Sequence, residues 1–283
     1  MNYKSLLPSF CLVLALSDFS WAQSAGTSFS EAQKTKKAKL ICLYSETPGY
    51  IEPAAEGAKG MLPAIMTSFA AYVRKNQGID VTCVYESFKI NTPIPEIFNI
   101  VNSSGDGVFG LVFVFITDER RKQVMFSDPI FQSPSFLITS NTVPEIKSVG
   151  EASQKLKGFT AYVNQGNFYE VKFRALKNSS LPDLKIEYFK SYHVANIAET
   201  VAKPNAMMYV DVSGFLYALE KKLPFKSHKV LQFTTPMGVT LSKANTWKDE
   251  FNKFLQSGYL KSGEFKKVVA DNLGHLTLDL LKI

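Results

Sequence analysis

Two charged residues stand where an apolar run gives way to a helix, and together they could hold a small ligand. Arg120 follows the run 108–116, which is typical of a buried strand, through Thr117, a favourable helix N-cap. Asp211 lies near the end of a second run, 207–212. Arginine can take a carboxylate through two parallel hydrogen bonds, and aspartate can accept from an ammonium group. These residues therefore predict a site for a zwitterionic or anionic ligand.

Each residue also has an ordinary structural interpretation. Arg120 opens a basic run with Arg121 and Lys122, so it can be a solvated arginine in the first turn of a helix. Asp211 precedes an expected helix, where aspartate commonly serves as the N-cap. The sequence leaves both interpretations open.

The first elements of the chain predict a strand–helix–strand unit. The strands are 39–44 and 81–85, and the helix is 61–75, whose apolar residues recur at helical spacing before Gly78 ends it. Such a unit makes a parallel pair of strands, and ligands bind outside the carboxyl ends of parallel strands. The loop 46–51 is therefore placed at a site. Tyr50 and Tyr44 are its candidate residues, with ordinary surface tyrosines as the alternative.

The rest of the chain alternates strands and helices. The loop 164–169 contains Gly166 and opens a helix, so its backbone N–H groups suit an anion; a plain strand-to-helix turn is the alternative. Asn167 and Phe168 are the candidate residues in this loop. The expected strands are 136–139, 159–163, 184–189, 207–212, 229–233 and 238–242, and the expected helices are 97–101, 149–157, 192–202, 213–219, one beginning near 245, and 264–272.

The stretch 106–131 resembles the core signature of bacterial periplasmic solute-binding proteins of the amino-acid-binding type (family 3). The matching residues are Asp106-Gly107, Ile116-Thr117-Asp118-Glu119-Arg120 and Phe126-Ser127-Asp128-Pro129-Ile130. The resemblance covers roughly residues 38–273. It implies an α/β fold of two lobes (a Venus flytrap), each a mostly parallel sheet flanked by helices, joined by a two-strand hinge.

The resemblance also implies roles for particular residues. Arg120 would hold the ligand carboxylate, Asp211 the ligand amino group, and Tyr50 would offer an aromatic ring. Asn167 and Phe168 replace hydroxyl residues of the family's pattern. Phe113-Val114-Phe115 stands where the family usually has a hydroxyl residue, and a phenyl ring cannot donate that hydrogen bond. Phe115 therefore indicates a less polar ligand, a pocket that has degenerated, or simply the core of a strand.

The predicted organisation has five segments. Residues 1–22 are typical of a signal peptide, with Lys4, an apolar run over 6–16 and the small-x-small site Ser20-Trp21-Ala22; a buried N-terminal helix is the alternative. Residues 23–37 are expected to be a tether. Residues 38–134 would form the first part of lobe 1, 135–234 lobe 2, and 235–283 the C-terminal part of lobe 1, with crossovers near 132–135 and 234–236.

Composition narrows the range of functions. The 283 residues carry a formal net charge of +7, with 46% hydrophobic and 20% charged residues, so a globular chain is expected. The lysines are scattered, which disfavours nucleic acid. His193, His228 and His275 are isolated, so no metal or other cofactor is expected. Cys42 and Cys83 lie in neighbouring expected strands, either as free buried thiols or as a strained bridge.

We therefore expect an exported, periplasmic, monomeric protein that binds an amino acid or related carboxylate for an ABC-type uptake system and is not an enzyme. A sensing or accessory protein that couples to a membrane sensor is the alternative, and an enzyme of the same fold, such as a dehydratase, comes third. Ligand identity is left open.

Overall fold

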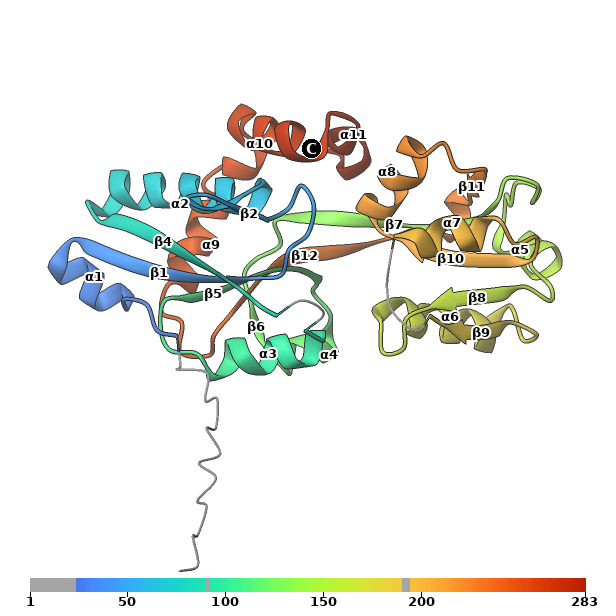
Figure 1. The fold of residues 1–283 in the computed structure, drawn as a ribbon, viewed down its shortest axis with the longest axis horizontal. Helices are drawn as coiled ribbons and strands as arrows, with labels where there is room; N and C mark the ends of the chain where they lie inside the picture. Colours follow the sequence, from blue (N-terminus) through green and yellow to red (C-terminus); the bar gives the residue numbers. More distant parts are fainter. Residues whose placement is uncertain (1–23, 90–91, 190–193) are drawn as a thin grey trace, which may run out of the picture.

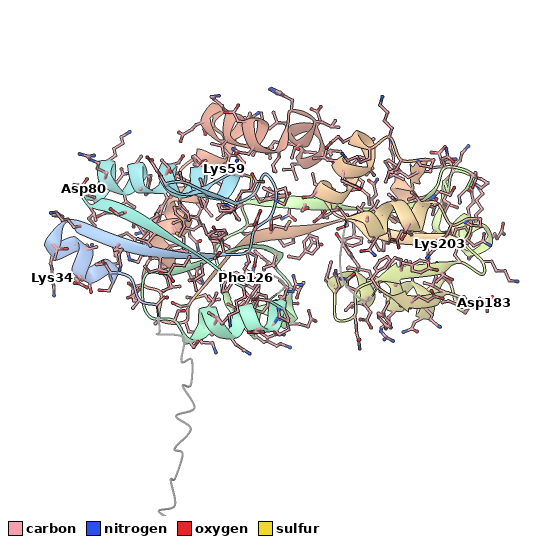
Figure 2. All side chains as sticks on the ribbon, in the orientation of Figure 1. Lys34, Lys59, Asp80, Phe126, Asp183 and Lys203 are labelled. Carbon is pink, nitrogen blue, oxygen red and sulfur yellow. The ribbon has the colours of Figure 1, made fainter. Side chains whose placement is uncertain are left out.

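The computed structural model describes residues 24–89, 92–189 and 194–283. The predicted signal peptide lies outside these ranges. None of the helices within them is both long and apolar enough to cross a membrane. The molecule is elongated: Lys34 lies at the outer end of one lobe and Asp183 at the outer end of the other (Figure 2).

The first lobe is built on three parallel strands between two layers of helices. The strands are, in spatial order, β4 (Asp80–Ser87), β1 (Lys37–Tyr44) and β5 (Val108–Phe115). Alternation along β1 sends Leu40 and Cys42 towards α2 (Met61–Gln77), and Ile41 and Leu43 towards α3 (Ile94–Ser103). Both faces are therefore buried, and the two helices cover them from opposite sides (Figure 1).

Two long strands run through both lobes. The first half of β7 (Phe131–Ser140) pairs with β12 (Phe233–Leu241) up to Ser135, and from Phe136 onwards β7 pairs with β10 (Ala206–Val210). Beyond Met237, β12 pairs with β5 of the first lobe. Ten strands of the described ranges thus form one continuous sheet, and β7 and β12 are the two strands that join its halves (Figure 1).

The second lobe repeats the parallel arrangement. β10 pairs in parallel with β8 (Thr160–Val163), which pairs in parallel with β9 (Lys185–Tyr188). A short strand, β11 (Phe225–Ser227), borders β7. The helices of this lobe are α5 (Val149–Lys155), α6 (Phe168–Ser179), α7 (Ala195–Val201) and α8 (Val212–Glu220). The first two residues of the helix expected over 192–202 lie outside the described residues.

The C-terminal helices return to the first lobe. α10 (Gly263–Leu273) packs on α2, and α11 (Leu276–Leu281) reaches β7; α9 (Lys248–Gln256) lies on the same side of the first lobe. Trp247 precedes α9 and is fully buried with Phe251 and Phe69. These aromatic contacts fix the C-terminal part of the chain to the first lobe.

The expected tether is wrong for the described part of 23–37. Residues Phe29–Thr35 form α1, capped by Ser28, and β1 already begins at Lys37. Ala32 is fully buried, and the Phe29 ring lies 4.9 Å from that of Trp247. Lysines and polar residues dominate this segment in the sequence, but Phe29 packs on the buried Trp247 and Ala32 lies in the hydrophobic core.

The expected strand over 229–233 is also wrong. Lys229–Leu231 is a 3-10 turn, η1, and β12 begins only at Phe233. The backbone N–H of His228 donates to Leu137, which ends the pairing on that side before the turn. Further elements were not predicted as such. They include β11, α11, the hairpin of β2 (Glu52–Ala54) and β3 (Gly57–Lys59), and the short β6 (Met125–Phe126), which pairs with β12.

Cys42 and Cys83 are free thiols on adjacent strands. The register of β1 and β4 sets Cys42 opposite Tyr85, and Cys83 opposite Leu40. The two thiols are therefore offset by two residues. Burial raises the pKa of Cys42 well above its ordinary value.

Candidate ligand-binding site

Arg120 is the half-buried residue of its basic run, whereas Arg121 and Lys122 are exposed. It lies in α4 (Asp118–Arg121), the short helix that follows β5. The hydroxyl of Thr117 caps this helix by accepting from the backbone N–H of Arg120, at 3.2 Å. The guanidinium Nη1 donates to the carbonyl oxygen of Phe115 at 3.0 Å. Burial lowers the pKa of Arg120. Because a guanidinium is not deprotonated in proteins, the group is a partly desolvated cation.

The aromatic rings beside Arg120 come from both lobes. The ring of Phe115, at the end of β5, lies 5.2 Å from that of Phe168 and 5.8 Å from that of Tyr169. Phe233, at the start of β12, lies 5.9 Å from Phe168 and 5.1 Å from Tyr209. These five residues form the interlobe aromatic cluster. It brings aromatic rings of both lobes together between the end of β5 and the start of α6.

Asp211 is the N-cap of α8. Its Oδ1 accepts from the backbone N–H of Gly214 at 2.9 Å. Burial raises the pKa of the Asp211 carboxyl, and hydrogen bonds from the backbone of Gly214 and Ser213 oppose that shift. The N-cap interpretation of Asp211 is therefore observed directly. The carboxylate has already committed an oxygen to its own helix.

Tyr50 is buried and reaches across to the second lobe. Its hydroxyl shares a hydrogen bond with the side chain of Ser213 and lies near Asp211. Burial, chiefly, and then the carboxylate of Asp211 raise the pKa of Tyr50. Tyr50 is therefore not the surface tyrosine of the alternative interpretation. Tyr44, the second candidate of this region, is buried in the core around α2.

The loop before α6 does not present free backbone donors in the expected way. Asn167 caps the helix by accepting from the backbone N–H of Tyr169 at 3.1 Å. The carboxylate of Glu170 accepts from the backbone N–H of Gly166 at 2.7 Å. The expectation that these N–H groups await an anion is wrong for both, because the helix satisfies them with its own side chains.

Lys172 belongs to the same region and was missed by sequence reasoning. Its Nζ lies 5.0 Å from the ring centre of Phe168 and 4.8 Å from that of Phe233. The spacing of four residues from Phe168 places both on one helical face and was the available signal. The contact with Phe233, which lies 61 residues further along the chain, had no signal in the sequence.

The site residues therefore fall into two groups. In the first group, Arg120 contacts Phe115, and Phe115 contacts Phe168. In the second group, Tyr50 lies near Asp211. Asn167 lies beside the first group, where it is the N-cap of α6. That Arg120 and Asp211 grip opposite ends of one ligand stays a prediction.

Two half-open pockets of the described residues lie away from this site. One, of about 300 Å³, lies between β4 and α3 and is lined by Leu43, Glu86 and Phe88 among others. The other, of about 260 Å³, lies in the second lobe beside Leu156 and Leu181. In the part of the chain that the structure describes, no three histidine, cysteine, aspartate or glutamate residues gather in a way that could hold a metal ion.

Comparison with known proteins places the fold. No protein-family model matches the sequence, and neither does any curated protein. Solved structures do match. The GluR0 ligand-binding core from Nostoc punctiforme in complex with L-glutamate has a TM-score of 0.59 at 17% identity, over 83% of this chain and 99% of that chain. The substrate-binding protein of an amino acid ABC transporter has a TM-score of 0.55 at 19% identity, over 83% and 98%.

A third similar structure is an ancestral amino-acid-binding protein described as a precursor of cyclohexadienyl dehydratase. Its TM-score is 0.58 at 20% identity, over 86% of this chain and 97% of that chain. These neighbours are amino-acid-binding proteins of two lobes. The likeness confirms the predicted fold, the two-lobed periplasmic-binding-protein-like architecture.

Proposed function

We propose that this protein is an exported solute-binding protein that captures a small amino-acid-like or carboxylate ligand between its lobes. One observation carries the proposal: a half-buried arginine at the end of a strand, with one acceptor among the described residues, faces an aromatic cluster contributed by both lobes. A guanidinium has five donors, so most of those of Arg120 remain for a ligand carboxylate. The aromatic rings would cover the apolar part of the same molecule.

The hinge gives this site a means of closing. β7 and β12 are the strands that pass between the lobes, and the partner of β7 changes between Ser135 and Phe136. This supports lobe boundaries at 38–134, 135–234 and 235–283. A ligand that contacts both lobes stabilises the closed arrangement, because it binds that state more tightly than the open one.

The partner that we propose is an ABC-type permease in the membrane, with the chain exported to the periplasm by residues 1–22 and acting as a monomer. One neighbour supports this partner, because it is the substrate-binding protein of an amino acid ABC transporter. The GluR0 ligand-binding core, which holds L-glutamate, supports the ligand class alone. We propose no catalytic step. Mass spectrometry of the exported protein should find a mature chain that begins at or near Gln23; an intact Met1 in membrane-bound material would contradict export.

A thermal-shift screen of the mature chain tests the binding function. Amino acids and small organic acids would be added singly at millimolar concentration. A ligand that binds only the folded state raises stability by about 2.7 kcal/mol at a hundred times its Kd, so at least one acid should raise the Tm by several degrees. If no compound of either class shifts the Tm, the proposed function fails.

A further inference from the structure

Lys172 places its own ammonium group on the interlobe aromatic cluster. It extends from α6, one turn after Phe168, and its ammonium lies over the rings of Phe168 and Phe233. Phe233 belongs to a hinge strand, and Phe168 touches Phe115 of the first lobe. The ammonium therefore lies against the interlobe aromatic cluster. The face of an aromatic ring is where a cationic group binds best, and here the protein's own lysine occupies it.

No carboxylate in the described ranges forms an ion pair with either cation of this region. Glu170, on the same helix as Lys172, is paired with Arg174 at 2.7 Å. Asp211 is committed to the first turn of α8. The ion pairs found among the described residues do not include Arg120 or Lys172. The interlobe aromatic cluster therefore lies beside two partly buried positive charges, Arg120 and Lys172.

We infer that the cleft selects organic acids whose remote end is uncharged or acidic, and that Lys172 is the residue that rejects ligands with a cationic side chain. This rests on the proposed function, because it names the ligand class of the same site. A carboxylate at Arg120 leaves the remote end of the ligand among Phe115, Phe168 and Phe233. An uncharged ring would pack there, and a second carboxylate would pair with the ammonium of Lys172. A cationic end would meet a like charge on surface that is already occupied.

Calorimetric titration with four probes tests this inference. The probes are phenylpyruvate, succinate, L-glutamate and L-arginine, and the proteins are the wild type, Lys172→Met and the control Lys177→Met. Lys177 lies on the same helix but is exposed. Methionine retains an unbranched apolar stem and removes the charge. Lys172→Gln provides a second neutral variant if the methionine variant unfolds.

The wild type should bind at least one of the acids and bind L-arginine at least about tenfold more weakly, since like charges brought together on a desolvated surface cost more than the 1.4 kcal/mol that equals tenfold in affinity. Lys172→Met should narrow that gap by raising the affinity for L-arginine, and it should weaken succinate and glutamate more than phenylpyruvate. Lys177→Met should match the wild type with every probe.

Two contrary outcomes are distinguishable. If the wild type binds L-arginine as tightly as the acids, or if Lys172→Met leaves the preference unchanged, the inference is wrong while the solute-binding function stands. If neither the acids nor arginine bind the wild type or the variants, the proposed function fails, and the inference fails with it.

Discussion

The two ends of the interlobe site place a charged residue at the same kind of position, yet they use it differently. At the end of β5, the hydroxyl of Thr117 caps α4, and the charge of Arg120 is left to face the second lobe. At the end of β10, Asp211 is itself the cap of α8. The backbone N–H groups at the start of a helix need an acceptor. A charged side chain there is free to bind a ligand only if a neutral residue caps the helix instead. The difference predicts that Arg120 contributes mainly to ligand binding, whereas Asp211 contributes mainly to the stability of the fold.

The largest effect is expected from Arg120→Ala. Removing one partner of a desolvated charge pair costs roughly 2–5 kcal/mol, so affinity for the best acid of the thermal-shift screen should fall by about thirty-fold to several thousand-fold. The fold should remain, because within the described part of the chain the guanidinium makes one hydrogen bond, to the carbonyl oxygen of Phe115. Calorimetry measures the loss. Arg121→Ala, an exposed neighbour on the same helix, is the matched control and should bind as the wild type does.

Asp211→Ala should lower the stability of the fold more than it lowers the affinity for carboxylate ligands. Loss of an N-cap costs about 0.5–2 kcal/mol, which urea unfolding should detect as a lower midpoint. Binding of plain carboxylates should change little, and amine-bearing ligands should lose more. Asp211→Asn keeps a capping oxygen and should recover most of the stability. Full stability in Asp211→Ala would contradict the structural role assigned to this residue.

Much of this contrast could be predicted from the sequence, and the remainder could not, for a physical reason. Thr117 and Asp211 were both identifiable as N-caps, because capping depends on a residue and its next three neighbours. The strands β1, β5 and β10 followed from runs of apolar residues. Three contacts could not be predicted, because each joins segments that lie far apart in the sequence and meet only in the tertiary fold. They are Lys172 with Phe233, Tyr50 with Ser213, and Phe29 with Trp247.

Tyr50→Phe probes the contact at the Asp211 end. It removes the hydroxyl that bonds to Ser213 and leaves the buried ring in place. A hydrogen bond contributes about 0.5–1.5 kcal/mol net, so the closed arrangement should become less favourable by that amount and ligand affinity should fall less than about tenfold. Titration of Tyr50→Phe beside Ser213→Ala measures this. The two variants should behave alike, and a loss as large as that of Arg120→Ala would show that the two ends do not differ.

The smallest expected effect concerns pH. Burial raises the folded-state pKa of Asp211 above its ordinary 3.8, so its contribution to stability is greatest below that value and declines as the pH rises through the folded-state pKa. Asp211→Asn cannot ionise and should lack this decline. Urea midpoints collected between about pH 3 and pH 7 for the wild type and Asp211→Asn provide the measurement, and parallel pH profiles would contradict a perturbed carboxyl at this end.

The most direct measurement of the central claim is a crystal structure of the mature chain with the acid that gives the largest thermal shift. The account predicts that the carboxylate contacts the guanidinium of Arg120, that the remote end packs among Phe115, Phe168 and Phe233, and that both lobes touch the ligand. A ligand held in the cavity between β4 and α3, or one that contacts a single lobe without Arg120, would contradict it.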